Sequence, residues 1–159
     1  MPNKVYWELA ALTAVEYFPG IADAATDLKN KLTDDAALGA AIDNTNAYQY
    51  IRFRLRVRLQ AGATSGYVNL WLIRGMDLGA GIVYEDGAGG TSPTIPARAP
   101  DCIIPVTNTI VTQQVIDGGP ILAPPEDFMI LLENKTGQSF TNTDNENELW
   151  YQLFSDEIQ

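Results

Sequence analysis

The stretch that decides the fold is residues 51–59, Ile-Arg-Phe-Arg-Leu-Arg-Val-Arg-Leu. Apolar residues and arginines alternate here without exception. Successive side chains of an extended strand point to opposite faces of a sheet, whereas a helix would spread these arginines around its circumference. The alternation therefore predicts a β-strand that packs one apolar face on a core and turns a cationic face outward.

The other apolar stretches are short and are separated by Gly, Pro, Asn and Asp, which is typical of strands joined by turns. The first part of residues 5–18 also alternates like a strand. We expect further strands near residues 67–73, 82–84, 102–106, 109–115, 128–133 and 149–154. The sequence therefore predicts an all-β fold, a jelly-roll-like antiparallel β-sandwich with a helix- or loop-containing N-terminal segment.

The strands differ in how deeply they are expected to lie and in how they are joined. Residues 67–73 are apolar on both sides except at Asn69, so we expect this strand to be buried on both faces. Only a short loop separates it from residues 51–59, and we expect the two to pair as a hairpin. Residues 118–120, Gly-Gly-Pro, are expected to form a turn, and the Pro-rich residues 93–100 are expected to cross between sheets.

Length and composition indicate one domain. The chain has 159 residues, of which 46% are hydrophobic and 19% charged, and a chain of this size buries roughly two-thirds of its unfolded surface. We assign residues 43–155 to the β-sandwich domain and residues 156–159 to a frayed acidic C-terminus. Residues 1–42 form an N-terminal segment, either an arm or part of the sandwich, in which residues 23–42 are a short helix or an ordered loop.

The charge balance and the missing histidine exclude several classes of function. Twenty acidic residues against ten basic residues give a formal net charge of −10, which disfavours nucleic acid and membrane surfaces as partners. Without histidine the chain cannot build a Ser-His-Asp triad, a Cys-His dyad or a His-ligated zinc site. The single cysteine, Cys102, cannot form an internal disulfide, and we expect it to be buried and inert. We therefore expect no enzymatic activity, cofactor, metal site or small-molecule substrate.

Neither a signal peptide nor a membrane span is expected. Glu8 and Glu16 interrupt the apolar residues near the N-terminus, so they leave no continuous h-region. No window of the sequence approaches the roughly 20 apolar residues that a transmembrane helix needs. These patterns predict a chain that is synthesised in the cytoplasm.

The four arginines of the alternating stretch form the strongest candidate site. Like charges two residues apart on a strand lie about 7 Å apart and repel each other unless an anionic group faces them. Three kinds of partner are possible: carboxylates of this chain, carboxylates of another subunit or protein, and a phosphate or anionic sugar. Nucleic acid would require aromatic residues beside the arginines, but Phe53 lies on the opposite face. The predicted protein interface consists of Arg52, Arg54, Arg56, Arg58, Tyr48 and Tyr50.

Carboxylates elsewhere form weaker patterns. Asp77, Glu85 and Asp86 flank a Gly-rich loop, but nothing in the sequence fixes the separation that two catalytic carboxylates need. Residues 144–148 faintly resemble a calcium loop, but they lack the Gly at its sixth position and the bidentate Glu at its twelfth. We therefore expect no catalytic role for the first group and interpret the second as a solvated turn.

Two further patterns also have an ordinary structural interpretation. Trp7, Trp71 and Trp150 could form a platform for sugars, but tryptophans within strands are more often core or interface residues. Asn134 begins a glycosylation sequon, which we interpret as a chance turn.

An ordered series of short motifs between residues 40 and 155 is similar to a known group of proteins. The motifs are DNTN (43–46), the alternating strand, GYVNLWL (66–72), YEDG (84–87), PARAPD (96–101), PPEDF (124–128) and ENKTGQ (133–138). In this order they resemble small structural proteins that tailed bacteriophages encode near their head genes. The resemblance implies a β-sandwich that acts as a capsid cement or decoration protein on the capsid surface of the virion and binds the major capsid protein.

A cement protein would bind the outside of the head and stabilise adjacent major capsid subunits without an active site. We expect a homo-oligomer, with a trimer favoured, because closed symmetry would cover exposed edge strands. The alternative is a tail-associated module of a fibre or baseplate that recognises host carbohydrate, in which the three tryptophans would matter.

Overall fold

The computed structural model describes residues 5–9, 13–15, 36–39, 41–60, 65–77, 79, 81–85, 94–107, 114–141 and 147–158. Within these residues the chain forms β-strands and no α-helix. The strands are β1 (Val5–Leu9), β2 (Thr13–Val15), β3 (Ala36–Leu38), β4 (Tyr50–Val57), β5 (Ser65–Asp77), β6 (Ile82–Tyr84), β7 (Cys102–Thr107), β8 (Gln114–Leu122), β9 (Phe128–Lys135) and β10 (Glu148–Ile158). Nowhere in the described part is there a helix of the length and apolarity needed to cross a membrane.

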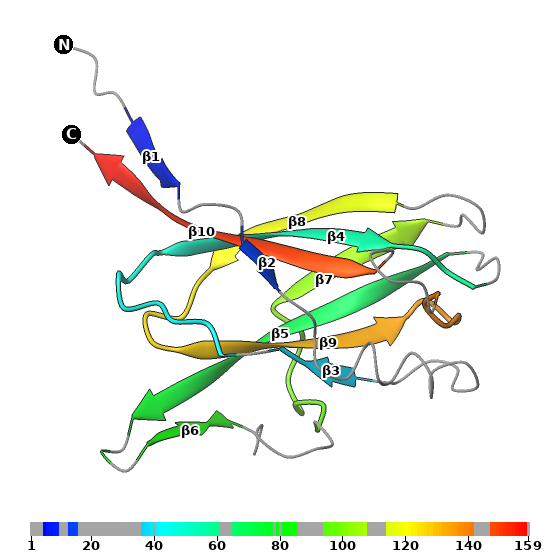
Figure 1. Ribbon diagram of the computed structural model, residues 1–159, viewed down its shortest axis with the longest axis horizontal. Helices are drawn as coiled ribbons and strands as arrows, with labels where there is room; N and C mark the ends of the chain where they lie inside the picture. Colours follow the sequence, from blue (N-terminus) through cyan, green and yellow to red (C-terminus); the bar gives the residue numbers. More distant parts are fainter. Residues whose placement is uncertain are drawn as a thin grey trace.

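The strands form two antiparallel sheets (Figure 1). Sheet 1 has the order β1-β10-β4-β8, and β2 also pairs with β10. Sheet 2 has the order β3-β9-β5-β6, and β7 also pairs with β5. The predicted all-β, antiparallel and sandwich-like fold is confirmed at this level, and the alternating stretch is strand β4.

The N-terminal segment adds short strands to both sheets. Strands β1 and β2 pair with β10, and β3 pairs with β9. Most of residues 23–42, the predicted helix or loop, lies outside the described residues, but Ala36–Leu38 is a strand.

Strands that are far apart in the chain pair in a nested order. The outermost pair joins β1 and β2 to β10, the next joins β3 to β9, then β4 to β8, and the innermost joins β5 to β7. Two more pairings, β10 with β4 and β9 with β5, connect these pairs into the sheets. Each sheet therefore combines strands from the first and the second half of the chain.

The core lies between the two sheets. In β4 the residues of the apolar face, from Ile51 to Val57, are each at most 2% exposed, which confirms the face predicted from the alternation. Alternate residues of β5, β7 and β9 face them from sheet 2. The main buried members of this cluster are Ile51, Phe53, Leu55, Val57, Val68, Leu70, Leu72, Ile104, Val106, Phe128, Ile130, Leu132, Leu149 and Leu153.

Strand β5 is central in sheet 2 and is buried on both faces over most of its length, as predicted. Its outward-facing Trp71 and Ile73 form a second cluster with Leu131 of β9. Residues 94–101 are held against this face, because the indole N–H of Trp71 donates a hydrogen bond to the backbone oxygen of Arg98 (3.1 Å). A buried polar group is thereby satisfied by a loop that covers it.

The predicted hairpin between residues 51–59 and 67–73 is wrong. Strands β4 and β5 belong to different sheets and face each other across the core. After Val57 the chain leaves sheet 1, and Leu59 bridges to Phe140, the residue that follows the turn after β9. Each strand has an apolar face, and packing the two faces together buries more apolar surface than a hairpin that leaves both on one side.

Two predicted connections are also wrong. Residues 118–120 are not a turn but lie within β8, where the pairing with β4 shifts register between Ile51 and Phe53. Gly119 adopts a φ of +91° at this β-bulge, a conformation that glycine reaches without steric cost. The Pro-rich residues 93–100 do not cross between sheets, because they connect β6 and β7, and both of these strands pair with β5.

Strand β1 and the last part of β10 form a two-stranded ribbon that extends beyond the rest of sheet 1 (Figure 1). Strand β4 begins opposite Phe154, so the pairing of β10 beyond this point is with β1 alone. Residues 156–158, expected to be part of a frayed end, are paired with β1 here.

Candidate functional site

The arginine face is the outer face of sheet 1, where Arg52, Arg54 and Arg56 project from β4. On one side of these residues lies β10, which places Gln152, Trp150 and Glu148 opposite them in that order. On the other side lies β8, which places Asp117 opposite Arg54 and Val115 opposite Arg56. The period of two in the sequence thus puts three guanidinium groups in one row between two neighbouring strands.

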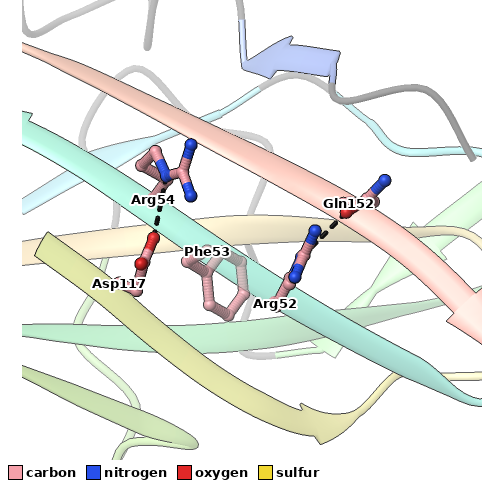
Figure 2. Close-up of a pocket in the computed structure, with 5 residues that line it drawn as sticks. All are labelled: Arg52, Phe53, Arg54, Asp117 and Gln152. Carbon is pink, nitrogen blue, oxygen red and sulfur yellow. Dashed lines mark hydrogen bonds and ion pairs between the residues drawn. The ribbon is translucent and has the colours of Figure 1, made fainter. Parts of the chain in front are cut away.

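Arg54 pairs with a carboxylate of β8 (Figure 2). Its Nε donates a hydrogen bond to Oδ1 of Asp117 at 2.8 Å. This hydrogen bond and the negative charge of Asp117 raise the pKa of Arg54 above its ordinary value. Both side chains are well exposed, at 46% and 73%, so water and salt weaken the attraction and the pair chiefly orients the guanidinium.

Arg56 is the most enclosed member of the row. Its Nη2 donates to Oε2 of Glu148, and the two side chains are only 25% and 29% exposed. The guanidinium also lies over the ring of Trp150, 4.9 Å from the ring centre, in cation–π geometry. These two contacts on β10 fix Arg56 against its own sheet.

We expect the two ion pairs to differ in strength. In a double-mutant cycle with Arg56→Gln and Glu148→Gln, the coupling free energy should be about 1 kcal/mol, because the pair is partly desolvated. The matched cycle with Arg54→Gln and Asp117→Asn should give a smaller coupling. Urea unfolding at low salt and at about 1 M salt, where the Debye length is about 3 Å, measures both. A coupling free energy that is equal in the two cycles, or larger for the exposed pair of Arg54 and Asp117, would contradict the expectation that partial burial strengthens the pair of Arg56 and Glu148.

Arg52 lies at a different kind of position. Its Nε donates to Oε1 of Gln152 at 2.8 Å, so its neighbour on β10 is neutral. On β8 the bulge at Gly119 lies beside it, and no residue of β8 is directly paired with Arg52. A shallow depression of about 100 Å³ opens here, lined by Arg52, Phe53, Arg54, Asp117 and Gln152 (Figure 2).

The remaining predicted interface residues lie around this row. The backbone N–H of Arg58, just after β4, donates to Oδ1 of Asn147 (3.0 Å). Tyr50 continues the face beyond Arg52 and stacks on Phe154, with ring centres 5.5 Å apart. Tyr48 packs against the core instead, and its backbone is held by hydrogen bonds to the buried side chain of Asn44.

Sequence reasoning missed Asp117, Gln152 and the role of Glu148 as partners of the arginines. Along the chain, Asp117 lies 63 residues from Arg54. Gln152 lies 100 residues from Arg52, and Glu148 lies 92 residues from Arg56. The alternation of β10 between apolar and polar residues was a possible signal, because Leu149, Tyr151 and Leu153 point to the core. Choosing β10 as the neighbour of β4, however, required the sheet order.

The structure weakens the other candidate sites. Trp71 is 2% exposed and its indole N–H is bonded, so its ring is not available to a sugar, and the ring of Trp150 is covered by Arg56. The side chain of Trp7 lies outside the described residues. In the described part, no three His, Cys, Asp or Glu residues are grouped as a metal site would require, and residues 144–146 lie outside that part.

Asn134 of the sequon is 4% exposed and closes the turn after β9. Its Oδ1 accepts hydrogen bonds from N and Oγ1 of Thr136, and its Nδ2 donates to the backbone oxygen of Gln138. The side chain is fully used in this turn, which agrees with the interpretation of the sequon as a structural feature.

Cys102 is buried at the start of β7, with 8% exposure. Burial raises the pKa of its thiol, and this effect outweighs the opposing hydrogen bond with the backbone of Gly119. The thiolate is the reactive form of cysteine, so the structure agrees with the expected inert thiol.

We expect the native protein to react with a thiol reagent such as DTNB on the order of 100-fold more slowly than the protein unfolded in urea, because the thiol is both shielded and protonated. The rate of absorbance change in the two states measures this ratio. Equal rates would show that β7 opens readily and that Cys102 is accessible.

Comparisons with known proteins identify no relative. No family model, no curated protein and no solved structure matches the chain.

Proposed function

We propose that the chain is a non-enzymatic structural protein of a tailed-bacteriophage virion, a cement or decoration protein that binds the outside of the head and stabilises adjacent major capsid subunits. The sequence motifs that resemble phage structural proteins support the virion origin. The arginine face supports the binding role, because it offers a fixed cationic surface on a chain of net charge −10. The row of guanidiniums held by Gln152, Asp117 and Glu148 is the observation that carries the proposal.

The strand pairing supports a jelly roll as the finer description of the fold. In a jelly roll, eight strands form two Greek keys in two facing sheets, an architecture used by viral capsid proteins and lectins. Here the nested pairs alternate between the sheets: β1 and β2 with β10 in sheet 1, β3 with β9 in sheet 2, then β4 with β8 in sheet 1 and β5 with β7 in sheet 2. Such alternation is what rolling one long hairpin into two layers produces.

The proposed partners follow from charge and from the sheet edges. A row of cationic side chains that is already oriented contributes more to the specificity and register of an interface than to its affinity. In the described residues, the outer edges of β8 and β3 have no neighbouring strand, and open edges are usually covered in stable assemblies. We propose the major capsid protein as the partner of the arginine face and a homo-oligomer, with a trimer favoured, as the form that covers the edges.

The test is to locate the chain in the virion and to remove the row. A cryo-EM map should show density for this fold on the outer shell. Purified protein should co-sediment with capsids that lack it and should not bind glycans. Changing Arg52, Arg54, Arg56 and Arg58 together to Glu should abolish attachment while circular dichroism still reports β-structure. Density on the tail, or binding to host glycans without attachment to capsids, would favour the tail-associated alternative and contradict the cement role.

A further inference from the structure

The members of the arginine face are not equivalent. Arg56 faces the carboxylate of Glu148, and Arg54 faces the carboxylate of Asp117. The hydrogen-bond partner of Arg52 is the neutral amide of Gln152. Arg52 is exposed, and within the described part of the chain its Nη1 and Nη2 atoms have no hydrogen-bond acceptor. Among these three arginines it is therefore the one whose charge this face leaves uncompensated.

The bulge in β8 lies at this position. The register that pairs Arg54 with Asp117 would put Gly119 opposite Arg52, and the register beyond the shift would put Pro120 there, so neither residue of the bulge brings a carboxylate to Arg52. A Cβ atom built on Gly119 would lie 3.3 Å from Cα of Arg52 and 3.1 Å from the backbone oxygen of Ile51, so the glycine lies tightly against β4. Bulges often occur beside functional sites, where they re-aim or free a side chain.

We propose that the depression at the bulge binds a carboxylate side chain of another protein in the assembly, with Arg52 as its principal donor; this inference rests on the proposed structural role. The planar guanidinium offers two parallel N–H donors that match a carboxylate. Arg52 and Arg54 line the depression together with Asp117, so its walls carry one more positive than negative charge. Beside Arg52 along the strand, Tyr50 is paired in register with Leu122, which is 73% exposed and offers an apolar contact to the same partner.

Other occupants fit these features less well. A sugar ring commonly stacks on an exposed aromatic ring, but on this face Tyr50 is stacked on Phe154 and Trp150 lies under Arg56. In the proposed homo-oligomer a second copy of this chain covers the open edges of β8 and β3, which leaves the arginine face to a different protein. An acidic side chain beside an apolar residue on a different protein matches both the cation and Leu122.

The first experiment measures attachment of single variants to purified capsids. Arg52→Glu should weaken attachment at least tenfold, and the neutral variant Arg52→Gln should remove most of the salt dependence of attachment. Arg74→Glu is the matched control, since it makes the same charge change at an exposed arginine of sheet 2 and should leave attachment within twofold. If wild-type protein attaches and Arg52→Glu attaches equally well, the proposed function stands and this inference is overturned.

The second experiment tests the depression without a capsid. The wild-type protein, uniformly labelled with ¹⁵N, is titrated with a peptide of alternating Glu and Leu, with inorganic phosphate and with glucuronic acid, while the Nε signal of Arg52 is followed by NMR. A saturable shift with the peptide, at least tenfold tighter than with the other two and absent in Arg52→Gln, supports the inference. The inference is overturned if the peptide gives no saturable shift, or if the protein prefers phosphate or the sugar acid. It is also overturned if the protein self-associates in sedimentation equilibrium and Arg52→Glu abolishes that association.

Discussion

Truncating Phe128 to alanine is expected to remove about 3–5 kcal/mol of unfolding free energy. Phe128 is 0% exposed and belongs to the core cluster between the sheets. Its backbone N–H and C=O also pair with Ile42, so the strand around it is held from both sides and cannot collapse into the space that the ring leaves. The loss would be at least a fifth of the roughly 5–15 kcal/mol typical of a domain.

Urea unfolding followed by tryptophan fluorescence measures this change. Ile103→Ala is the control, because Ile103 lies in β7 with 56% exposure and its truncation should change stability by less than about 0.5 kcal/mol. A loss below about 1 kcal/mol for Phe128→Ala would mean that Phe128 is not packed in the core.

Replacing Gly66 by valine is expected to cost at least about 2 kcal/mol of unfolding free energy and to disturb the start of β5. A Cβ atom at Gly66 would lie 2.3 Å from Cα of Thr136 and 2.9 Å from its carbonyl oxygen. The turn that contains Thr136 is fixed by the buried side chain of Asn134, so the backbone at Thr136 cannot move away without breaking those hydrogen bonds. The overlap is with backbone atoms, and a change of rotamer cannot relieve it.

Gly137 provides the control in the same turn. It has a φ of +74°, and a Cβ atom there would meet nothing within 4 Å. Asn tolerates this left-handed conformation better than other residues with side chains, so Gly137→Asn should cost much less than Gly66→Val. Similar melting temperatures for Gly66→Val and wild type in calorimetry would show that β5 and the turn are not in contact.

How much of the fold is predictable from sequence is shown by β4 and β8. The regular alternation of β4 arises because one face of the strand is exposed to solvent and the other is buried. This is a local property, so it can be recognised from the sequence alone. The partners of β4 do not follow from it, because β10 and β8 are brought to its sides by contacts between distant residues. The Gly-Gly-Pro of β8 has the composition of a turn, and only the pairing with β4 shows that the strand continues through it as a bulge.

The candidate site divides in the same way. The alternation predicts that the arginines share a face, and the repulsion between like charges predicts that anionic groups lie near. The structure places Asp117 and Glu148 of the same chain at two of the arginines, so the intrachain alternative holds at Arg54 and Arg56. That Arg52 is different depends on its neighbours, Gln152 of β10 and the bulge residues of β8, which no pattern within β4 records.

The position of β10 has a consequence for biosynthesis. This strand is translated after all the other described strands, yet it lies between β4 on one side and β1 and β2 on the other in sheet 1. Among the described strands, β1 and β2 therefore have no partner on the ribosome, and β4 can pair only with β8, until β10 emerges. We infer that the nascent chain holds apolar strands unpaired until β10 is made, and that deletion of β10 would leave β4 paired with β8 alone and β1 and β2 without a partner in sheet 1, rather than shorten the sheet by one strand.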